Sequence, residues 1–158
     1  MRYLCSLVTC LSLWVSTPSI AGSNFTPGTT GFGISVGDFG GLTLYHKLSD
    51  QNFVQAMISR DLLLAADYAY TFPGAVPSAP NLVPFVGGGG FAFSTRYWDV
   101  YEERGRRLTG IGARIPLGVL VQFPTAPVHI HADVTPTCTV IPFVESFLAV
   151  QVGVRFIL

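Results

Sequence analysis

The chain has 158 residues, of which 49% are hydrophobic and only 11% are charged, with nine basic and nine acidic side chains. A soluble domain carries about 25% charged residues, so this composition excludes a disordered chain and indicates either a membrane protein or a soluble protein with an apolar surface. The balanced charge disfavours nucleic-acid binding, which needs a basic surface for the phosphates.

The N-terminal residues 1–21 have the pattern of an export signal. Arg2 supplies a positive charge, a mostly apolar stretch follows it, and Ala21 closes a small-residue site of the kind that signal peptidases cleave. Cleavage there would leave a single mature domain, residues 22–158, whose only cysteine is Cys138. No internal disulfide could then form, so we expect Cys138 to be an apolar filler; an exposed, reactive thiol is the alternative.

In the rest of the chain, apolar residues alternate with polar or small ones, and this period of two is typical of β-strands with one apolar face. In the first half, strands are expected at residues 31–37, 42–48, 53–60 and 62–72. The alternation is irregular over 53–60. In the strand at 62–72, Tyr68 and Tyr70 lie opposite Asp67.

In the second half, strands are expected at residues 85–95, 110–123, 128–135 and 148–158. In the last strand every even position is apolar, while Gln151 and Arg155 lie on the other face. Phe85, Phe91 and Phe93 form the apolar face of the strand at 85–95. Three longer connections are expected to be loops, at residues 73–84, 96–107 and 136–146. No stretch after the export signal has the roughly 18 apolar residues that a membrane-spanning helix needs.

The polar faces of these strands discriminate between the folds that eight antiparallel strands can form. A soluble barrel would place Lys, Glu and Asp on its outer face, whereas these faces carry glycine and small residues with few charges of both signs. Such faces fit a narrow lumen. The predicted fold is therefore all-β: an eight-stranded antiparallel up-and-down (meander) transmembrane β-barrel, with apolar faces toward lipid and a lumen filled by side chains.

Five glycine-rich or strand-like segments occur in a characteristic order: Gly31–Gly37, Leu63–Tyr68, Phe85–Gly90, Gly112–Gly118 and Gly153–Phe156. In this order the chain resembles small eight-stranded outer-membrane β-barrels of Gram-negative bacteria. The resemblance implies an outer-membrane location and recognition of the C-terminal strand by the barrel-assembly machinery, and it implies no known activity. Such chains usually end in an aromatic residue, whereas this one ends in Leu158.

The ionisable side chains on the polar faces are the main candidate site. His129, His131 and Asp133 alternate along one strand and therefore share a face. We expect a hydrogen-bonded lumen network, because a charge enclosed in a narrow interior needs a partner. A metal site or a proton relay is the alternative, but no convergent set of metal ligands is evident, so neither a metal nor a cofactor is expected. The predicted network comprises Lys47, Asp67, Arg114, His129, His131, Asp133 and Arg155.

A charged stretch contains Arg104, Arg106 and Arg107 beside Glu102 and Glu103. Two interpretations stay open. The arginines are either solvated loop charges or contacts for lipopolysaccharide phosphates, since this loop would be extracellular if both chain termini are periplasmic.

The predicted function is a structural or surface-interaction role for a monomeric outer-membrane barrel that contacts membrane lipids, with no open pore. Two alternatives stay open. An embedded lipid hydrolase or acyltransferase could combine a histidine with Ser146 and Glu145, although the sequence has no recognised His-x-Ser signature. A soluble periplasmic barrel would instead carry an apolar ligand.

Overall fold

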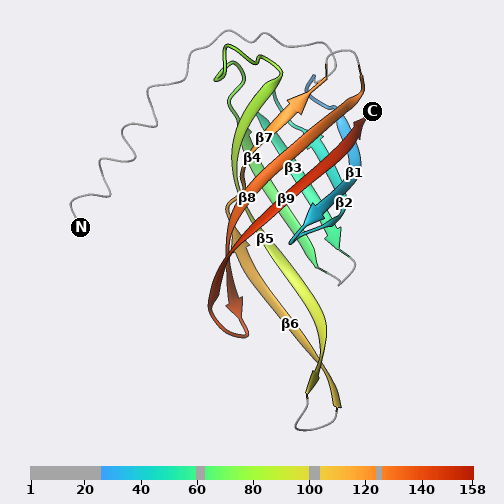
Figure 1. Ribbon diagram of the computed structural model, residues 1–158, viewed down its shortest axis with the longest axis vertical. Coiled ribbons are helices and arrows are strands. Elements are labelled where there is room, and N and C mark those ends of the chain that lie inside the picture. The colour runs from blue at the N-terminus through green and yellow to red at the C-terminus, as the bar shows by residue number, and fades with distance from the viewer. Residues whose placement is uncertain (1–25, 60–62, 100–103, 124–125) are drawn as a thin grey trace, which may run out of the picture.

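The computed structural model describes residues 26–59, 63–99, 104–123 and 126–158. The expected export signal, residues 1–21, lies outside the described residues. Every regular element in the described part is a strand (Figure 1), and no helix there could cross a membrane. The strands are β1 (Thr30–Gly37), β2 (Gly41–Lys47), β3 (Asn52–Ser59), β4 (Leu64–Thr71), β5 (Leu82–Asp99), β6 (Arg104–Arg114), β7 (Leu117–Gln122), β8 (Val128–Ile141) and β9 (Glu145–Ile157).

Strands β6 and β7 are two parts of one strand of the sheet. Arg114 lies opposite Thr137 of β8, and Leu117 lies opposite Val134, so the register continues across the interruption. The interruption falls at Pro116, which has no N–H to donate to the sheet. Every strand pairs antiparallel with its neighbours in the chain, and β1 pairs with β9. The structure therefore confirms the predicted eight-stranded antiparallel up-and-down barrel.

The stagger of the strands sets the width of this barrel. Following the register once around the sheet from Ile157 of β9 leads back to β9 at Phe147, ten residues away. The residues on this path are Gly31, Tyr45, Gln55, Asp67, Gly89, Arg114 and Thr137. A barrel of this kind tilts its strands by about 35–45° and is just wide enough for its own side chains.

The two faces of the wall have opposite chemistry. The outer face carries large exposed apolar side chains, and the inner face carries buried polar ones, as the alternation predicts. Exposed residues include Phe32, Ile34, Val36, Leu42, Leu44, Leu148, Val150, Val152 and Phe156. Buried residues include Thr43, Gln55, Asp67, Arg114, His129, His131, Asp133, Gln151 and Arg155.

The expected orientation of β5 is wrong. Phe85 and Phe91, assigned to the apolar outer face, are buried inside the barrel, while Gly88 and Gly90 are exposed. The strand is apolar or small at both sets of positions, so hydrophobicity alone does not show which set faces out.

Two of the expected loops are wrong as well. Residues 96–99 and 104–107 continue β5 and β6, with Arg96 opposite Arg107 and Asp99 opposite Arg104. Likewise β8 runs to Ile141 and β9 begins at Glu145. Both hairpins extend past the ends of the neighbouring strands, on the side away from the C-terminus (Figure 1). We call this side the hairpin end, and the side where β1 begins and β9 ends the base.

The β1–β9 seam generates a test of closure. At Gly33 a Cβ atom would collide with the backbone of Val154 in β9, whereas Gly88 has open space around its Cα. Gly33→Ala is expected to lower the free energy of unfolding by about 1–3 kcal/mol, because the two strands must move apart. Gly88→Ala is expected to leave it within about 0.5 kcal/mol. Urea unfolding of both variants in lipid vesicles measures the difference, and equal stabilities would contradict the seam.

Candidate functional site

An ion pair lies at the centre of the barrel interior. Arg114 of β6 and Asp67 of β4 are 1% and 4% exposed, and Arg114 Nε lies 3.1 Å from Asp67 Oδ1. The N–H bond does not point squarely at the oxygen, so the contact is electrostatic more than a well-formed hydrogen bond. Gly89 is opposite both residues in the register, and a Cβ there would collide with the Asp67 carboxylate. The glycine thus makes room for the pair.

A neutral amide joins this pair to a second enclosed guanidinium. Gln55 Nε2 donates to Asp67 Oδ2 at 2.9 Å, and Gln55 Oε1 accepts from Arg155 Nη2 at 2.8 Å. Arg155 Nε also donates to the Thr43 hydroxyl at 3.1 Å. Two arginines therefore share one carboxylate, the first by direct contact and the second through Gln55.

The histidines and the second carboxylate lie beside Arg155. His131 Nε2 is 3.3 Å from Arg155 Nη2, and the ring of His129 stands edge-on to Tyr45 with centroids 4.8 Å apart. Asp133 accepts one hydrogen bond from the Gln151 amide and one from the Thr135 hydroxyl, each at 2.7 Å. A guanidinium next to His131 repels a metal cation, and the described residues contain no group of three or more metal-ligating side chains suited to hold one.

Lys47, a further member of the predicted network, lies toward the base of the barrel. It is half-buried at the base end of β2, where the carboxylate of Asp50 attracts it. Tyr45 and Phe53, which belong to an apolar cluster, lie close to it along β2 and β3.

Apolar clusters bracket the polar centre along the barrel axis. The cluster at the base contains Tyr45, Phe53, Ala69, Val83, Phe85, Leu120 and Ile157. The cluster at the hairpin end contains Phe39, Met57, Ala65, Phe91 and Ala149. The ring centroid of Phe39 is 4.5 Å from the guanidinium carbon of Arg114, and Met57 Sδ is 3.4 Å from Arg114 Nη1. Gly37, whose φ is 122°, permits the tight turn that brings Phe39 back over the interior.

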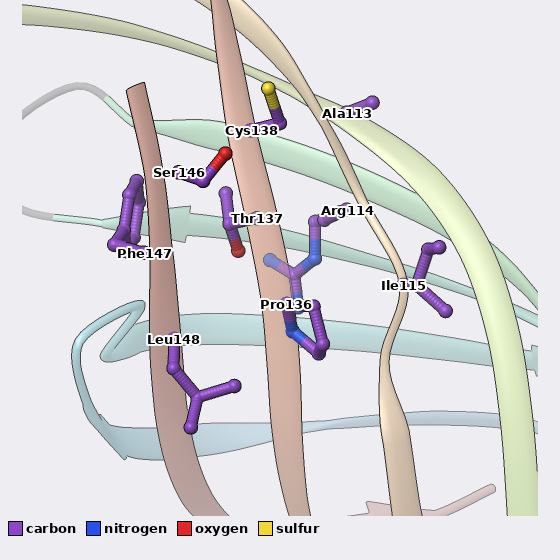
Figure 2. A pocket seen from close by; sticks show the side chains of 9 residues that line it. All are labelled: Ala113, Arg114, Ile115, Pro136, Thr137, Cys138, Ser146, Phe147 and Leu148. Carbon is purple, nitrogen blue, oxygen red and sulfur yellow. The ribbon is translucent and has the colours of Figure 1, made fainter.

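The outer wall carries a groove of about 470 Å³ across β6, β8 and β9 (Figure 2). Small side chains from the three strands, Ala113, Cys138 and Ser146, are opposite one another in the register. The Cys138 thiol is thus partly exposed on the outer wall. Ser146 is also on this wall, while His131 is buried inside, so the structure does not bring together the serine and histidine of the enzyme alternative.

The three arginines of the charged stretch are on a strand, which corrects the expected loop. Arg104, Arg106 and Arg107 belong to β6 and lie opposite Asp99, Tyr97 and Arg96 of β5. They form part of the ribbon that extends past the barrel at the hairpin end (Figure 1). Glu102 and Glu103 lie outside the described residues.

Sequence reasoning missed the neutral members of the network, above all Gln55. Gln55 alternates in sequence with Phe53 and Met57, and all three side chains point into the barrel. This period of two is the one feature of the sequence that could have identified Gln55 as an inward residue. These apolar neighbours hide the polar face from a search based on alternation.

The fold and the interior together define a class: an eight-stranded barrel with an apolar outer face and a charged core, which is the arrangement of small outer-membrane barrels. Among solved structures, the chain is similar to the N-terminal β-barrel domain of Pseudomonas aeruginosa OprF, with a TM-score of 0.64. The sequences are 15% identical, and the match covers 84% of this chain and 98% of that one. No protein-family model and no curated protein matches the sequence.

The central ion pair generates a stability prediction. Arg114→Ala leaves the enclosed Asp67 carboxylate without its cation, so the free energy of unfolding is expected to fall by about 3–5 kcal/mol. Lys47→Ala, at the half-exposed base, is expected to cost at most about 1 kcal/mol. Urea titrations followed by tryptophan fluorescence measure both values. A loss of less than about 1 kcal/mol for Arg114→Ala would mean that water reaches the pair.

Proposed function

We propose that this protein is a monomeric outer-membrane barrel of a Gram-negative cell envelope with a structural or surface-interaction role. The inside-out distribution of its side chains carries the proposal: Ile34, Val36 and Leu148 are more than 60% exposed, while Arg114 and Arg155 are at most 1% exposed. A soluble carrier of an apolar ligand would need the reverse arrangement. Lipid around the barrel would cover the exposed side chains.

The proposed role does not include conduction through an open pore. Arg114 and Arg155 extend into the interior, and the clusters that contain Phe53 and Phe91 lie on the two sides of them. An eight-stranded barrel has room for little besides such side chains. The lumen is thus proposed to be filled, and the wall and hairpins are left as the interacting surfaces.

The β5–β6 hairpin is the proposed contact for lipopolysaccharide. It extends past the barrel on the side opposite the C-terminus, which is extracellular if both termini are periplasmic. Arg104, Arg106 and Arg107 are within four residues on β6, with Arg96 opposite Arg107. Guanidinium groups bind phosphate oxygens in a bidentate manner, so this ribbon suits the phosphorylated sugars at an outer-leaflet surface.

The C-terminal strand supports the proposed route of assembly. Strand β9 closes the barrel against β1, and Phe156 and Leu158 are exposed near its end. Phe156 lies two residues before Leu158 and on the same outer face of the strand. This exposed aromatic offers the barrel-assembly machinery an apolar signal, although the terminal residue itself is not aromatic.

If the barrel lies in a membrane, the destabilisation caused by an outward-facing arginine should depend on the depth of that residue in the bilayer. Val152 is exposed at the middle of β9, and Val152→Arg is expected to lower the free energy of unfolding in lipid vesicles by about 2–4 kcal/mol. Val144→Arg is the matched control, since Val144 is 77% exposed in the turn of the β8–β9 hairpin. Its cost is expected to be below about 1 kcal/mol. Similar losses at both positions, or recovery of the protein in a soluble periplasmic extract, would contradict the membrane proposal.

The proposed lipopolysaccharide contact is tested by removing the three positive charges of the ribbon in one variant. The unmodified barrel is expected to be more stable in vesicles that contain phosphorylated lipopolysaccharide than in vesicles with the dephosphorylated form, by about 1–3 kcal/mol. In the triple variant Arg104→Gln, Arg106→Gln, Arg107→Gln this difference is expected to vanish. Lys47→Gln, which removes a charge at the base, is expected to retain it. A difference that survives in the triple variant would place the contact elsewhere.

A further inference from the structure

A cavity of about 320 Å³ opens at the hairpin end of the barrel. Its described lining is mostly apolar and includes Leu63, Phe91, Phe93, Leu108, Phe143 and Phe147. The volume is within the range of about 300–1,000 Å³ typical of small-molecule sites, and the mouths of barrels are common places for such sites. None of the ionisable residues of the polar centre is among its described lining residues.

Aromatic rings form a fixed floor and side wall in this cavity. Phe147 stacks on Phe39 at 6.1 Å between ring centroids and stands edge-on to Phe91 at 6.5 Å. Phe91 also stacks with Phe93 at 6.1 Å. Phe39 is itself packed on the Arg114 guanidinium, so the polar centre supports the floor of the cavity on the side toward the base. Phe143 and Phe147 nevertheless remain 48% and 43% exposed, which leaves apolar surface open to an occupant.

The charge of the described lining residues favours a cation as the occupant. Asp38 and Glu145 are the two charged side chains among the described lining residues, and both are acidic. Asp38 is held in place because its Oδ2 accepts a hydrogen bond from the backbone N–H of Val150 at 2.8 Å. Glu145 is exposed at the start of β9, opposite Thr139 of β8, which also lines the cavity.

We propose that this cavity binds a small organic cation, specifically an ammonium group attached to an apolar, preferably aromatic, body. The body packs against the phenylalanine rings, and the ammonium group lies among the ring faces and the two carboxylates. Aromatic faces attract cations, and the two exposed carboxylates at the rim add an attraction that solvent and salt partly screen. An organic anion of the same shape is repelled by the same two carboxylates.

Three probes that share one ring system test the charge selection: 1-naphthylmethylammonium, 1-naphthylmethanol and 1-naphthoate. The full chain is folded into lipid nanodiscs, and binding is measured by calorimetry against empty nanodiscs, which removes the contribution of the bilayer. The cation is expected to bind about tenfold more tightly than the neutral alcohol, and the anion is expected not to bind. Equal binding of all three probes, or no binding above that of empty nanodiscs, would overturn the proposal.

Two substitutions locate the site. Glu145→Gln is expected to weaken the cation about threefold to tenfold while leaving the neutral alcohol unchanged. Asp38→Asn keeps an oxygen for the Val150 N–H and is expected to act in the same direction. Asp50→Asn, which removes an acidic charge at the base, is the matched control and is expected to have no effect. Equal losses in Asp50→Asn and Glu145→Gln would assign the preference to overall charge and overturn the proposed site.

A second pair of variants tests the apolar part without a change of charge. Phe143→Ala removes an exposed ring at the hairpin turn and is expected to weaken the cation and the alcohol by a similar factor. Val144→Ala, at the neighbouring position in the same turn, is expected to change neither. Retention of the unboiled, compact band on a gel shows that each variant is folded. Undiminished binding by folded Phe143→Ala would place the probe outside this cavity.

Discussion

A β-sheet inside a bilayer has no water to satisfy the N–H and C=O groups of its edge strands, so the two edges must pair with each other. In this chain that requirement is met by β1 and β9, whose backbones are in register from Gly31 opposite Ile157 to Gly37 opposite Gln151. Eight strands with a stagger of ten residues fix the strand tilt and the width of the barrel. The composition of the interior follows from that width.

A narrow interior that contains arginines must supply their partners from a few inward positions. Arg114 meets Asp67 directly, and Arg155 reaches the same carboxylate through Gln55, so one anion serves two cations. The second anion, Asp133, is instead satisfied by the neutral donors Gln151 and Thr135. Breaking such an arrangement costs more than forming it gains, because each remaining charge would be enclosed without its partner.

The sequence alone was sufficient for the strand count and for the inward charges, since β8 and β9 alternate with little interruption and Arg155 and Asp133 fall on the polar side. It was not sufficient for β5, where glycines and phenylalanines leave both faces compatible with lipid. It also missed the neutral bridge Gln55, because the inward neighbours on β3 are apolar. The ribbon that contains Arg96 and Arg107 resembled a loop, since its sequence is charged and lacks the apolar alternation of the other strands.

The layers along the barrel axis explain why the residues at the hairpin end are less constrained by packing than those inside the closed part of the barrel. Phe39 faces the polar centre on one side, where it covers Arg114, and stacks against Phe147 of the hairpin end on the other. Below this layer, the closed wall surrounds the inward side chains, and side-chain hydrogen bonds join Gln55, Asp67 and Arg155. Above it, residues 93–99 of β5 pair only with β6 among the described strands, and residues 145–150 of β9 pair only with β8. A rigid scaffold with unconstrained terminal hairpins is where binding residues can change without loss of the fold. For that reason we place both proposed contacts, the arginine ribbon and the aromatic cavity, at this end.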